Sequence, residues 1–185
     1  MKERILVTGG TGYIGSHTVV ELQNSGYDVV IVDNLSNSSA DVVDNIEKVS
    51  GIRPAFEKLD CLDLEGMDKL FTKYPGIKGI IHFAASKAVG ESVQKPLLYY
   101  RNNLVSLINL LELMPKHGVE GIIFSSSCTV YGQPDVLPVT EEAPIKKAES
   151  PYGNTKQINE EIIRDTVASG SPINAIMLRY FNPIG

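Results

Sequence analysis

Strand-like and helix-like segments alternate along the whole chain, and this alternation limits the folds that the sequence can adopt. Several strand candidates are rich in Val and Ile and apolar over most of their length, as strands buried on both faces of a parallel sheet are. The strand candidates are residues 4–8, 28–33, 55–60, 79–85, 121–127 and 173–180. The helix candidates are residues 13–25, 40–50, 65–74, 96–116 and 151–169. The pattern predicts an α/β fold with a doubly wound parallel sheet and right-handed crossovers.

The composition is that of one ordinary globular domain, expected to span residues 1–185. The chain has 185 residues, of which 43% are hydrophobic and 21% charged, so it can bury a sizeable core. The net charge of −5 argues against nucleic acid or an anionic membrane as the main partner. No apolar run is long enough to span a bilayer, and the opening MKERILVTGG lacks the pattern of a signal peptide. We therefore expect a cytoplasmic protein without a membrane partner.

The cysteines and histidines give no indication of a disulfide or a metal site. Cys61 and Cys128 lie far apart in the sequence and are interpreted as free thiols in a reducing compartment. The three histidines, His17, His82 and His117, share no metal-ligand spacing with the cysteines. The prediction is that the chain holds no metal ion.

A glycine-rich turn, VTGGTGYIGSH at residues 7–17, joins the first strand candidate to the first helix candidate. Gly9, Gly12 and Gly15 form G-x-x-G-x-x-G, and Gly10, Gly12 and Gly15 also form G-x-G-x-x-G. Such glycines permit a tight turn and close approach of the backbone to a pyrophosphate, which the N-terminal end of the next helix attracts. The setting predicts dinucleotide binding in a Rossmann fold; the alternative is an ordinary turn-rich loop.

Asp33 ends the second strand candidate, close to the ~20 residues after the glycine turn at which dinucleotide-binding proteins carry an acidic residue. A carboxylate there accepts hydrogen bonds from the adenosine ribose and repels a 2′-phosphate. The sequence therefore favours NAD over NADP. The alternative role of Asp33 is that of a capping residue in the loop.

Polar or small residues follow all six strand candidates. Ligands of open α/β sheets bind outside the carboxyl ends of the strands, so these residues are expected to surround one site. The segments are the glycine turn, DNLSNS (33–38), Asp60 with Cys61, FAASK (83–87), SSS (125–127) and YFNP (180–183). Alternatives stay open for three candidate residues: Asp60 as a cap of the helix at 65–74, Lys87 as a solvated loop residue, and Asn102 as a solvent-facing residue of the long helix.

Tyr152 and Lys156 form a Tyr-x-x-x-Lys pair at the start of the last helix candidate. Ser150 suits the N-cap and Pro151 the first helical position, so residues four apart share one face of that helix. The helix begins near the exit of the strand that ends in SSS (125–127). A hydroxyl, a phenol and an ammonium are therefore expected to converge at one place.

Removal of a hydride from a carbinol also requires removal of its hydroxyl proton. A free phenol has a pKa near ~10, and lowering it by about three units corresponds to roughly 4 kcal/mol. One nearby cation lowers the pKa of an acidic group by about one to three units. Lys156 together with a cationic nicotinamide is therefore expected to supply the lowering of the Tyr152 pKa. Tyr152 would then move the proton while Lys156 acts electrostatically. The other match, Tyr74 to Lys78, contains a Pro-Gly pair that breaks a helix, and we reject it.

These motifs resemble those of the extended short-chain dehydrogenase/reductases, and within that family the nucleotide-sugar 4-epimerases. The matching blocks run in order across essentially the whole chain: VTGGTGYIGSHT, DNLSNS, HFAASKAVGESV, YYRNN, SSSCTVYG, SPYGNTK and RYFNP. Each block alone is a weak signal, but the ordered set is specific.

The resemblance implies NAD as the cofactor and a catalytic triad of Tyr152, Lys156 and Ser127. It implies that the cofactor site is lined by Gly9, Gly12, Tyr13, Ile14, Gly15, Asp33, Asn34, Leu35, Ser36, Asn37, Ser38, Asp60, Cys61, Phe83, Ala84, Ala85, Ser86, Lys87, Asn102, Ser127, Tyr152, Lys156 and Phe181. It implies substrate contacts from Lys87, Ser127, Tyr152 and Asn182.

The resemblance also implies interconversion of UDP-glucose and UDP-galactose by transient oxidation at sugar C4. Tyr152 would take the proton from the 4-hydroxyl as hydride passes to tightly bound NAD. Ser127 would hydrogen-bond the 4-oxygen, and Lys156 would also hold the nicotinamide ribose. Hydride would then return to the other face of the 4-keto sugar, so the net reaction is an isomerisation in galactose metabolism.

Other functions stay open. Related dehydratases and decarboxylases carry acidic groups where this chain has Cys128 and Thr129, which disfavours elimination and decarboxylation. A 4-epimerase of another UDP-sugar, an N-acetylhexosamine or a uronic acid, ranks second. An NADPH-dependent reductase ranks third because of Asp33. A non-catalytic NAD-binding sensor belongs to a different class, and loss of Tyr152 or Lys156 would be its signature; both residues are present.

Members of the resembled family continue into a smaller domain that grips the nucleotide and sugar. We therefore expect a C-terminal substrate domain beyond residue 185, and little conversion of UDP-sugars by residues 1–185 alone. The resemblance also suggests a homodimer, and the helix at 96–116 offers an apolar face for packing against another helix.

Overall fold

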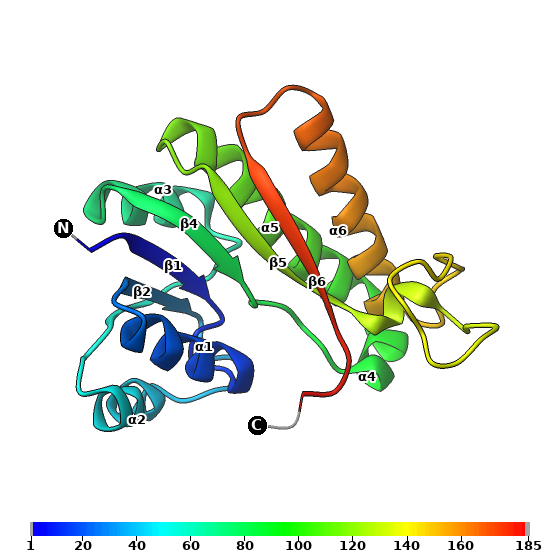
Figure 1. Cartoon of the computed structure of the whole chain (residues 1–185), viewed down its shortest axis with the longest axis horizontal. Coiled ribbons are helices and arrows are strands. Elements are labelled where there is room, and N and C mark those ends of the chain that lie inside the picture. Colours follow the sequence, from blue (N-terminus) through cyan, green and yellow to red (C-terminus); the bar gives the residue numbers. More distant parts are fainter. Residues whose placement is uncertain (1, 184–185) are drawn as a thin grey trace.

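The chain folds around one six-stranded parallel sheet in the computed structural model, which describes residues 2–183 (Figure 1). The strands are β1 (Arg4–Thr8), β2 (Asp28–Asp33), β3 (Ala55–Lys58), β4 (Ile77–His82), β5 (Gly121–Ser127) and β6 (Asn174–Tyr180). The helices are α1 (Tyr13–Asn24), α2 (Asp41–Ser50), α3 (Leu64–Lys73), α4 (Val89–Gln94), α5 (Pro96–Lys116) and α6 (Pro151–Ala168), with a 3-10 turn at Cys128–Tyr131. The strand order β3-β2-β1-β4-β5-β6 confirms the predicted doubly wound fold.

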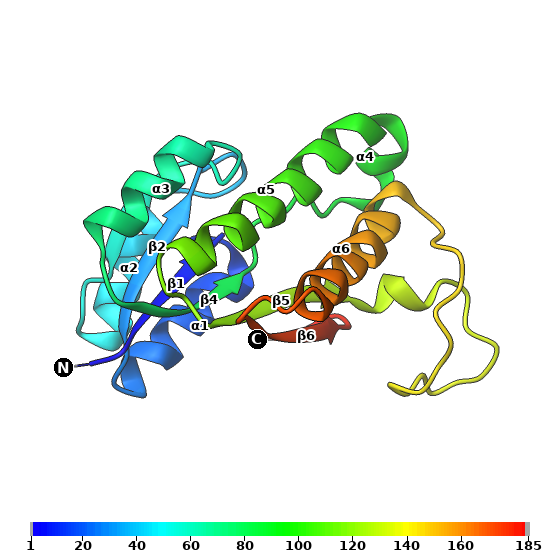
Figure 2. The ribbon, with the colours of Figure 1, turned by 90° about the horizontal axis from the view of Figure 1, so that it is seen from above.

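Helices lie on both faces of the sheet, and each covered face has its own core. On one face α3, α5 and α6 pack against strand residues such as Leu6, Ile80 and Phe124. On the other face α1 and α2 pack against Val7 and Ile31. Figure 2 shows α5 and α6 together on one side of β5 and β6. Because alternate strand residues enter the two cores, the inner strands are apolar at nearly every position.

The sequence located most elements to within two residues, with two exceptions. The fourth strand was expected at 79–85, but β4 ends at His82 because the chain then leaves the sheet for a loop held by α5. Helix α4 was not predicted, since six residues are too few for a periodic apolar pattern. The start of α6 is as predicted: the Ser150 hydroxyl accepts from the Gly153 N–H at 3.1 Å, and Pro151 is the first helical residue.

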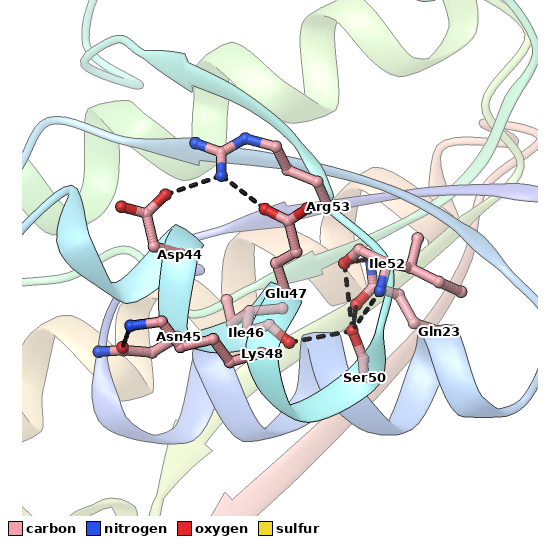
Figure 3. Close-up of polar contacts among 9 residues, drawn as sticks. All are labelled: Gln23, Asp44, Asn45, Ile46, Glu47, Lys48, Ser50, Ile52 and Arg53. Atoms are coloured by element: carbon pink, nitrogen blue, oxygen red, sulfur yellow. Dashed lines mark hydrogen bonds and ion pairs between the residues drawn. The ribbon is translucent and has the colours of Figure 1, made fainter.

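Polar contacts tie α2 to its surroundings near one edge of the sheet (Figure 3). Arg53, just after α2, donates to Asp44 Oδ1 and Glu47 Oε2, both at 2.7 Å. From α1, the buried Gln23 amide donates to the Ile52 carbonyl at 3.0 Å. The Gln23 contact holds the segment that follows α2 against α1, and the Arg53 contacts hold that segment against α2.

A buried carboxylate joins α6 to the last two strands. The Glu160 side chain is 1% exposed and accepts from the Ser126 hydroxyl at 2.6 Å. Arg179 of β6 donates to both carboxylate oxygens, at 2.9 and 2.7 Å, and Arg164 donates to one of them at 2.6 Å. Burial alone would raise the pKa of Glu160, but Arg179 and Ser126 outweigh burial and hold this pKa below its ordinary value. Glu160 therefore stays charged and holds α6 against β5 and β6.

One part of the sheet carries exposed apolar side chains. Ile176 and Leu178 of β6 are 56% and 40% exposed, and they lie on the face opposite α5 and α6. Figure 1 shows β5 and β6 without a described helix on this side. A neighbouring group of large exposed apolar side chains is typical of a surface that packs against a partner or another domain.

None of the helices within residues 2–183 combines the length and the hydrophobicity needed to cross a membrane.

Replacement of Arg179 by Met is expected to lower the free energy of unfolding by about 3 kcal/mol, because it leaves the buried Glu160 carboxylate with too few partners. The matched control is Lys69→Met, which removes an exposed pair with Glu65 and is expected to cost much less, because solvent screens exposed ion pairs. Urea unfolding followed by circular dichroism measures both losses. Equal losses in the two variants would contradict the importance of burial for this pair.

Candidate functional site

A cleft of about 980 Å³ opens along the carboxyl edge of the sheet. It receives residues from the exits of all six strands: Gly9, Asp33, Asp60, Ala84, Ser127 and Phe181. The volume lies at the upper end of the roughly 300–1,000 Å³ that is usual for small-molecule sites. The cleft therefore has room for a ligand as large as a dinucleotide, at the edge that the sequence predicted.

The glycine turn brings backbone segments closer together than a side chain would permit. A Cβ atom on Gly15 would lie 2.2 Å from the Gly9 carbonyl oxygen, and a Cβ atom on Gly9 would lie 2.7 Å from the Ala84 nitrogen. Gly9 also has a φ of +69°, which L-residues rarely adopt. Gly12 is the N-cap of α1 and supplies no capping side chain, so the first N–H groups of α1 can hold an anion.

Asp33 is mostly buried and reaches the cleft beside the glycine turn. Its carboxylate accepts from the Thr11 N–H at 3.2 Å, the Leu35 N–H at 2.9 Å and the Ser38 hydroxyl at 3.3 Å. A carboxylate has about four acceptor positions, so Asp33 retains capacity for a hydroxyl donor of a ligand.

Leu35 and Ser38 are not among the residues that line the cleft, although the sequence singled them out with the rest of segment 33–38. Leu35 has a φ of +60° and directs its N–H to Asp33. The Ser38 hydroxyl forms a 2.7 Å hydrogen bond with the Thr11 hydroxyl. Both residues shape the loop, while Asn34, Ser36 and Asn37 form its cleft-facing part.

Asp60 is not a helix cap, which was its alternative role. The N-cap of α3 is Asp63, whose carboxylate accepts from the Gly66 N–H at 2.9 Å. Asp60 lines the cleft and accepts from the Leu62 N–H and from the Asn34 amide, both at 2.9 Å. The contact with Asn34 connects the exits of β2 and β3.

Helix α5 holds the loop that follows β4 in the wall of the cleft. The buried Asn103 accepts from the Ser86 N–H at 2.8 Å and donates to the Ser86 carbonyl at 3.0 Å. Asn102 donates to the Ser86 hydroxyl at 3.1 Å, so it faces this loop and is not directed to open solvent. Lys87 is exposed and lines the cleft.

Tyr152, Lys156 and Ser127 all line the same cleft. Lys156 is buried, and its ammonium donates to the Ser125 carbonyl at 2.7 Å. The ammonium nitrogen lies 4.8 Å from the centre of the Phe124 ring and 5.8 Å from the centre of the Tyr152 ring. The predicted hydroxyl, phenol and ammonium are therefore brought together.

The acid–base balance of this group differs from the expectation. Burial raises the pKa of the Tyr152 phenol above its ordinary value, and the neighbouring Ser127 hydroxyl opposes that rise only in part. Burial also lowers the pKa of Lys156 to about 8. Lys156 is not among the groups that shift the pKa of Tyr152 here. The predicted lowering was assigned to Lys156 together with a cationic nicotinamide, so it stays a prediction for the site with NAD bound.

Gly10 of the glycine turn does not line the cleft and faces the Ile31 side chain of β2; the other residues assigned to the cofactor and substrate sites line the cleft, including Phe181 and Asn182. Several lining residues were not singled out: Leu59, Leu62, Ala88, Val89, Glu91, Leu98, Tyr99, Arg101 and Ser106. Leu59 and Leu62 could have been found as neighbours of Asp60. The residues of α4 and α5 could not, because their approach depends on how these helices pack.

Within residues 2–183 there is no cluster of three or more His, Cys, Asp or Glu side chains arranged to bind a metal ion. Cys61 and Cys128 are free thiols, the first buried and the second half-buried. Burial raises the pKa of Cys61 to about 12, so this thiol is unreactive at neutral pH.

The sequence pattern of the NAD dependent epimerase/dehydratase family matches residues 5–185. The chain belongs to this family. Among similar proteins, the UDP-glucose 4-epimerase of Bacillus subtilis is 51% identical over 181 residues, which cover 98% of this chain and 53% of that protein. The UDP-glucose 4-epimerase of Homo sapiens is 49% identical over 191 residues, covering 100% of this chain and 55% of that protein. The chain thus spans about half the length of the curated relatives it matches.

Solved structures agree with this assignment. UDP-glucose 4-epimerase from Bifidobacterium longum, in complex with NAD+ and UDP, has a TM-score of 0.95 at 47% identity, over 98% of this chain and 54% of that one. The UDP-glucose 4-epimerase from Stenotrophomonas maltophila, with bound NAD and a formylated UDP-arabinopyranose, has a TM-score of 0.94 at 46% identity. The match covers 99% of this chain and 54% of that one. The family resemblance inferred from the motifs is confirmed.

Lys156 is expected to make the protein more stable as the pH rises from about 8 toward about 9.5. Its pKa falls from 10.5 in the unfolded chain to about 8 in the folded protein, so in this range the unfolded chain binds the extra proton. The free energy of unfolding should then rise, by up to about 1 kcal/mol per pH unit. Urea unfolding of the wild type and of Lys156→Met measures the difference at each pH, with the exposed Lys69→Met as control. A pH-independent difference between wild type and Lys156→Met would contradict the lowered pKa.

Proposed function

We propose that this chain is the NAD-binding part of a UDP-glucose 4-epimerase, an isomerase that interconverts UDP-glucose and UDP-galactose by transient oxidation at sugar C4. One observation carries the proposal: the glycine turn and the Tyr152, Lys156 and Ser127 side chains line a single cleft at the carboxyl edge. Identities of 49–51% to UDP-glucose 4-epimerases over nearly the whole chain support it.

The residues of the cleft suit NAD as the resident cofactor. The glycine turn and the first turn of α1 would hold the pyrophosphate, since no side chain blocks the approach at Gly9, Gly12 and Gly15. Asp33 would accept from the adenosine ribose and repel a 2′-phosphate, which favours NAD over NADP. Lys156 would hold the nicotinamide ribose. When bound, NAD supplies the hydride acceptor and donor for sugar C4.

The chain's own side chains would carry the proton chemistry. Tyr152 would remove the proton from the 4-hydroxyl and return it to the 4-oxygen after the 4-keto sugar has presented its other face. Ser127 would hydrogen-bond the 4-oxygen. Lys156, together with the cationic nicotinamide, would favour the phenolate form of Tyr152 electrostatically. A non-catalytic NAD sensor has no need of these three groups in one cleft.

Three features of the whole protein belong to the same proposal. A smaller substrate domain beyond residue 185 would supply further sugar-nucleotide contacts beside Lys87 and Asn182, and it would cover the exposed Ile176 and Leu178 of β6.

A homodimer would pack through α5, on which Val105 and Ile108 are 37% exposed; light scattering that finds only monomer would contradict this. A cytoplasmic location suits the two free thiols.

The full-length protein, incubated with UDP-glucose or UDP-galactose, is expected to interconvert them without added reductant. Tyr152→Phe should retain NAD and lose about 10²-fold or more in rate, because only the proton carrier is removed. Chromatography of the nucleotide sugars and release of bound NAD measure the two properties, and UDP-N-acetylglucosamine and UDP-N-acetylgalactosamine serve as parallel substrates. The matched control is Tyr74→Phe, in the second Tyr-x-x-x-Lys match.

Near-normal conversion by Tyr152→Phe would remove Tyr152 as the proton carrier. Residues 1–185 alone are expected to bind NAD but to convert UDP-sugars inefficiently, because the second domain would supply part of the substrate contacts. Efficient conversion by this fragment would contradict that expectation.

A further inference from the structure

The loop between β4 and α4 is fixed on both sides of Lys87. Before Lys87, the Ser86 backbone is bound to the buried Asn103 amide. After Lys87, the Ala88 N–H donates to the Tyr99 phenol oxygen at 3.1 Å. Asn103 and Tyr99 both belong to α5 and are four residues apart, so they share one face of the helix. Lys87 therefore extends into the cleft from a backbone that is held at each neighbouring residue.

Tyr99 is 0% exposed, yet its phenol makes two hydrogen bonds. Besides accepting from Ala88, it donates to Glu91 Oε2 at 2.8 Å, and Lys95 donates to the other Glu91 oxygen at 3.0 Å. Burial, and next the bond to Glu91, raise the pKa of Tyr99, so the phenol stays protonated at neutral pH. Its proton remains directed to Glu91, which leaves the phenol oxygen free to accept from Ala88.

We propose that Tyr99 is a positioning residue: its phenol holds the Ala88 N–H and thereby directs the Lys87 ammonium to an anionic part of the dinucleotide. This role rests on the proposed function, in which the cleft binds NAD. A lysine side chain alone has many rotamers, and a fixed backbone reduces the entropy that binding must remove. The contribution of Tyr99 to ligand affinity is therefore indirect and depends on Lys87.

The chain contains a matched group remote from the cleft. Tyr74 donates to Glu57 Oε1 at 2.6 Å, and Lys73 donates to the same oxygen at 2.6 Å. Burial, and next the bond to Glu57, raise the pKa of Tyr74, as for Tyr99 with Glu91. Tyr74 does not line the cleft. Tyr74→Phe therefore removes the same kind of tyrosine–glutamate hydrogen bond and does not alter the contacts of the loop that carries Lys87.

The test measures the Kd of NAD by calorimetry for the full-length protein freed of cofactor. Tyr99→Phe is expected to weaken NAD binding about fivefold or more, and Tyr74→Phe less than about twofold, although each loses one tyrosine–glutamate hydrogen bond. Urea unfolding should show a larger loss of stability for Tyr99→Phe, because this variant also removes the acceptor of the Ala88 N–H. Equal Kd values for Tyr99→Phe and Tyr74→Phe would overturn the positioning role.

A double-mutant cycle tests whether Tyr99 acts through Lys87. In a Lys87→Ala background, Tyr99→Phe is expected to change the Kd less than about twofold. An undiminished effect of Tyr99→Phe in that background would overturn the proposal. If Tyr99→Phe does not fold, hydrogen exchange of the Ala88 N–H in the wild type replaces the pair of variants: slow exchange is expected, and exchange as fast as that of an unbound loop amide overturns the role. Wild-type protein that binds no NAD at all would overturn the proposed function itself, and this role with it.

Discussion

All six strands run in the same direction, and the site depends on this constraint. Thr8 at the end of β1 pairs with Val32 of β2 on one side and with His82 of β4 on the other. The segments that follow these strands must therefore leave the sheet at one edge, next to each other. The β1 and β4 exits approach so closely that a Cβ atom on Gly9 would lie 2.7 Å from the Ala84 nitrogen. The close packing of the β1 and β4 ends thus requires glycine in this turn. Because glycine has no side chain, the backbone of the turn is also accessible to a ligand.

Buried polar groups on the helices fix the loops that this edge gathers. Asn103 binds the backbone of Ser86, and Asn109, six residues further along α5, donates to the Cys61 carbonyl at 2.9 Å. Glu160 fixes α6 against β5 through the Ser126 hydroxyl. A neutral bond of this kind adds about 1 kcal/mol of stability and one to a charged group about 1.5–3 kcal/mol, and a lost partner would leave a buried group unsatisfied. These side chains therefore determine the positions of the loops and of α6 at the edge of the sheet.

The parts of this arrangement that rest on local signals could be predicted from the sequence. The close backbone approach at Gly15, the position of Asp33 at the end of a strand and the capping role of Ser150 could each be predicted from a few neighbouring residues. The contact of Tyr99 with the cleft loop could not be predicted, since helical spacing tells which residues share a face but not which loop that face meets. The same limit applies to Lys156: its spacing from a tyrosine on the same helix face did not reveal that a strand carbonyl would bind its ammonium.

The position of that ammonium has a consequence for the proposed chemistry. A buried phenol whose pKa is raised is a poor base at neutral pH, and Tyr152 is such a phenol. Lys156, with a pKa of about 8, is still mostly charged at neutral pH; its ammonium donates to the Ser125 carbonyl and lies 5.8 Å from the centre of the Tyr152 ring. A cationic ligand group near the phenol would lower the pKa of Tyr152 by about one to three units. Under the proposed function, the phenolate form of the base is therefore expected to be more populated when NAD is bound, where a proton removed from the sugar is matched by a hydride acceptor.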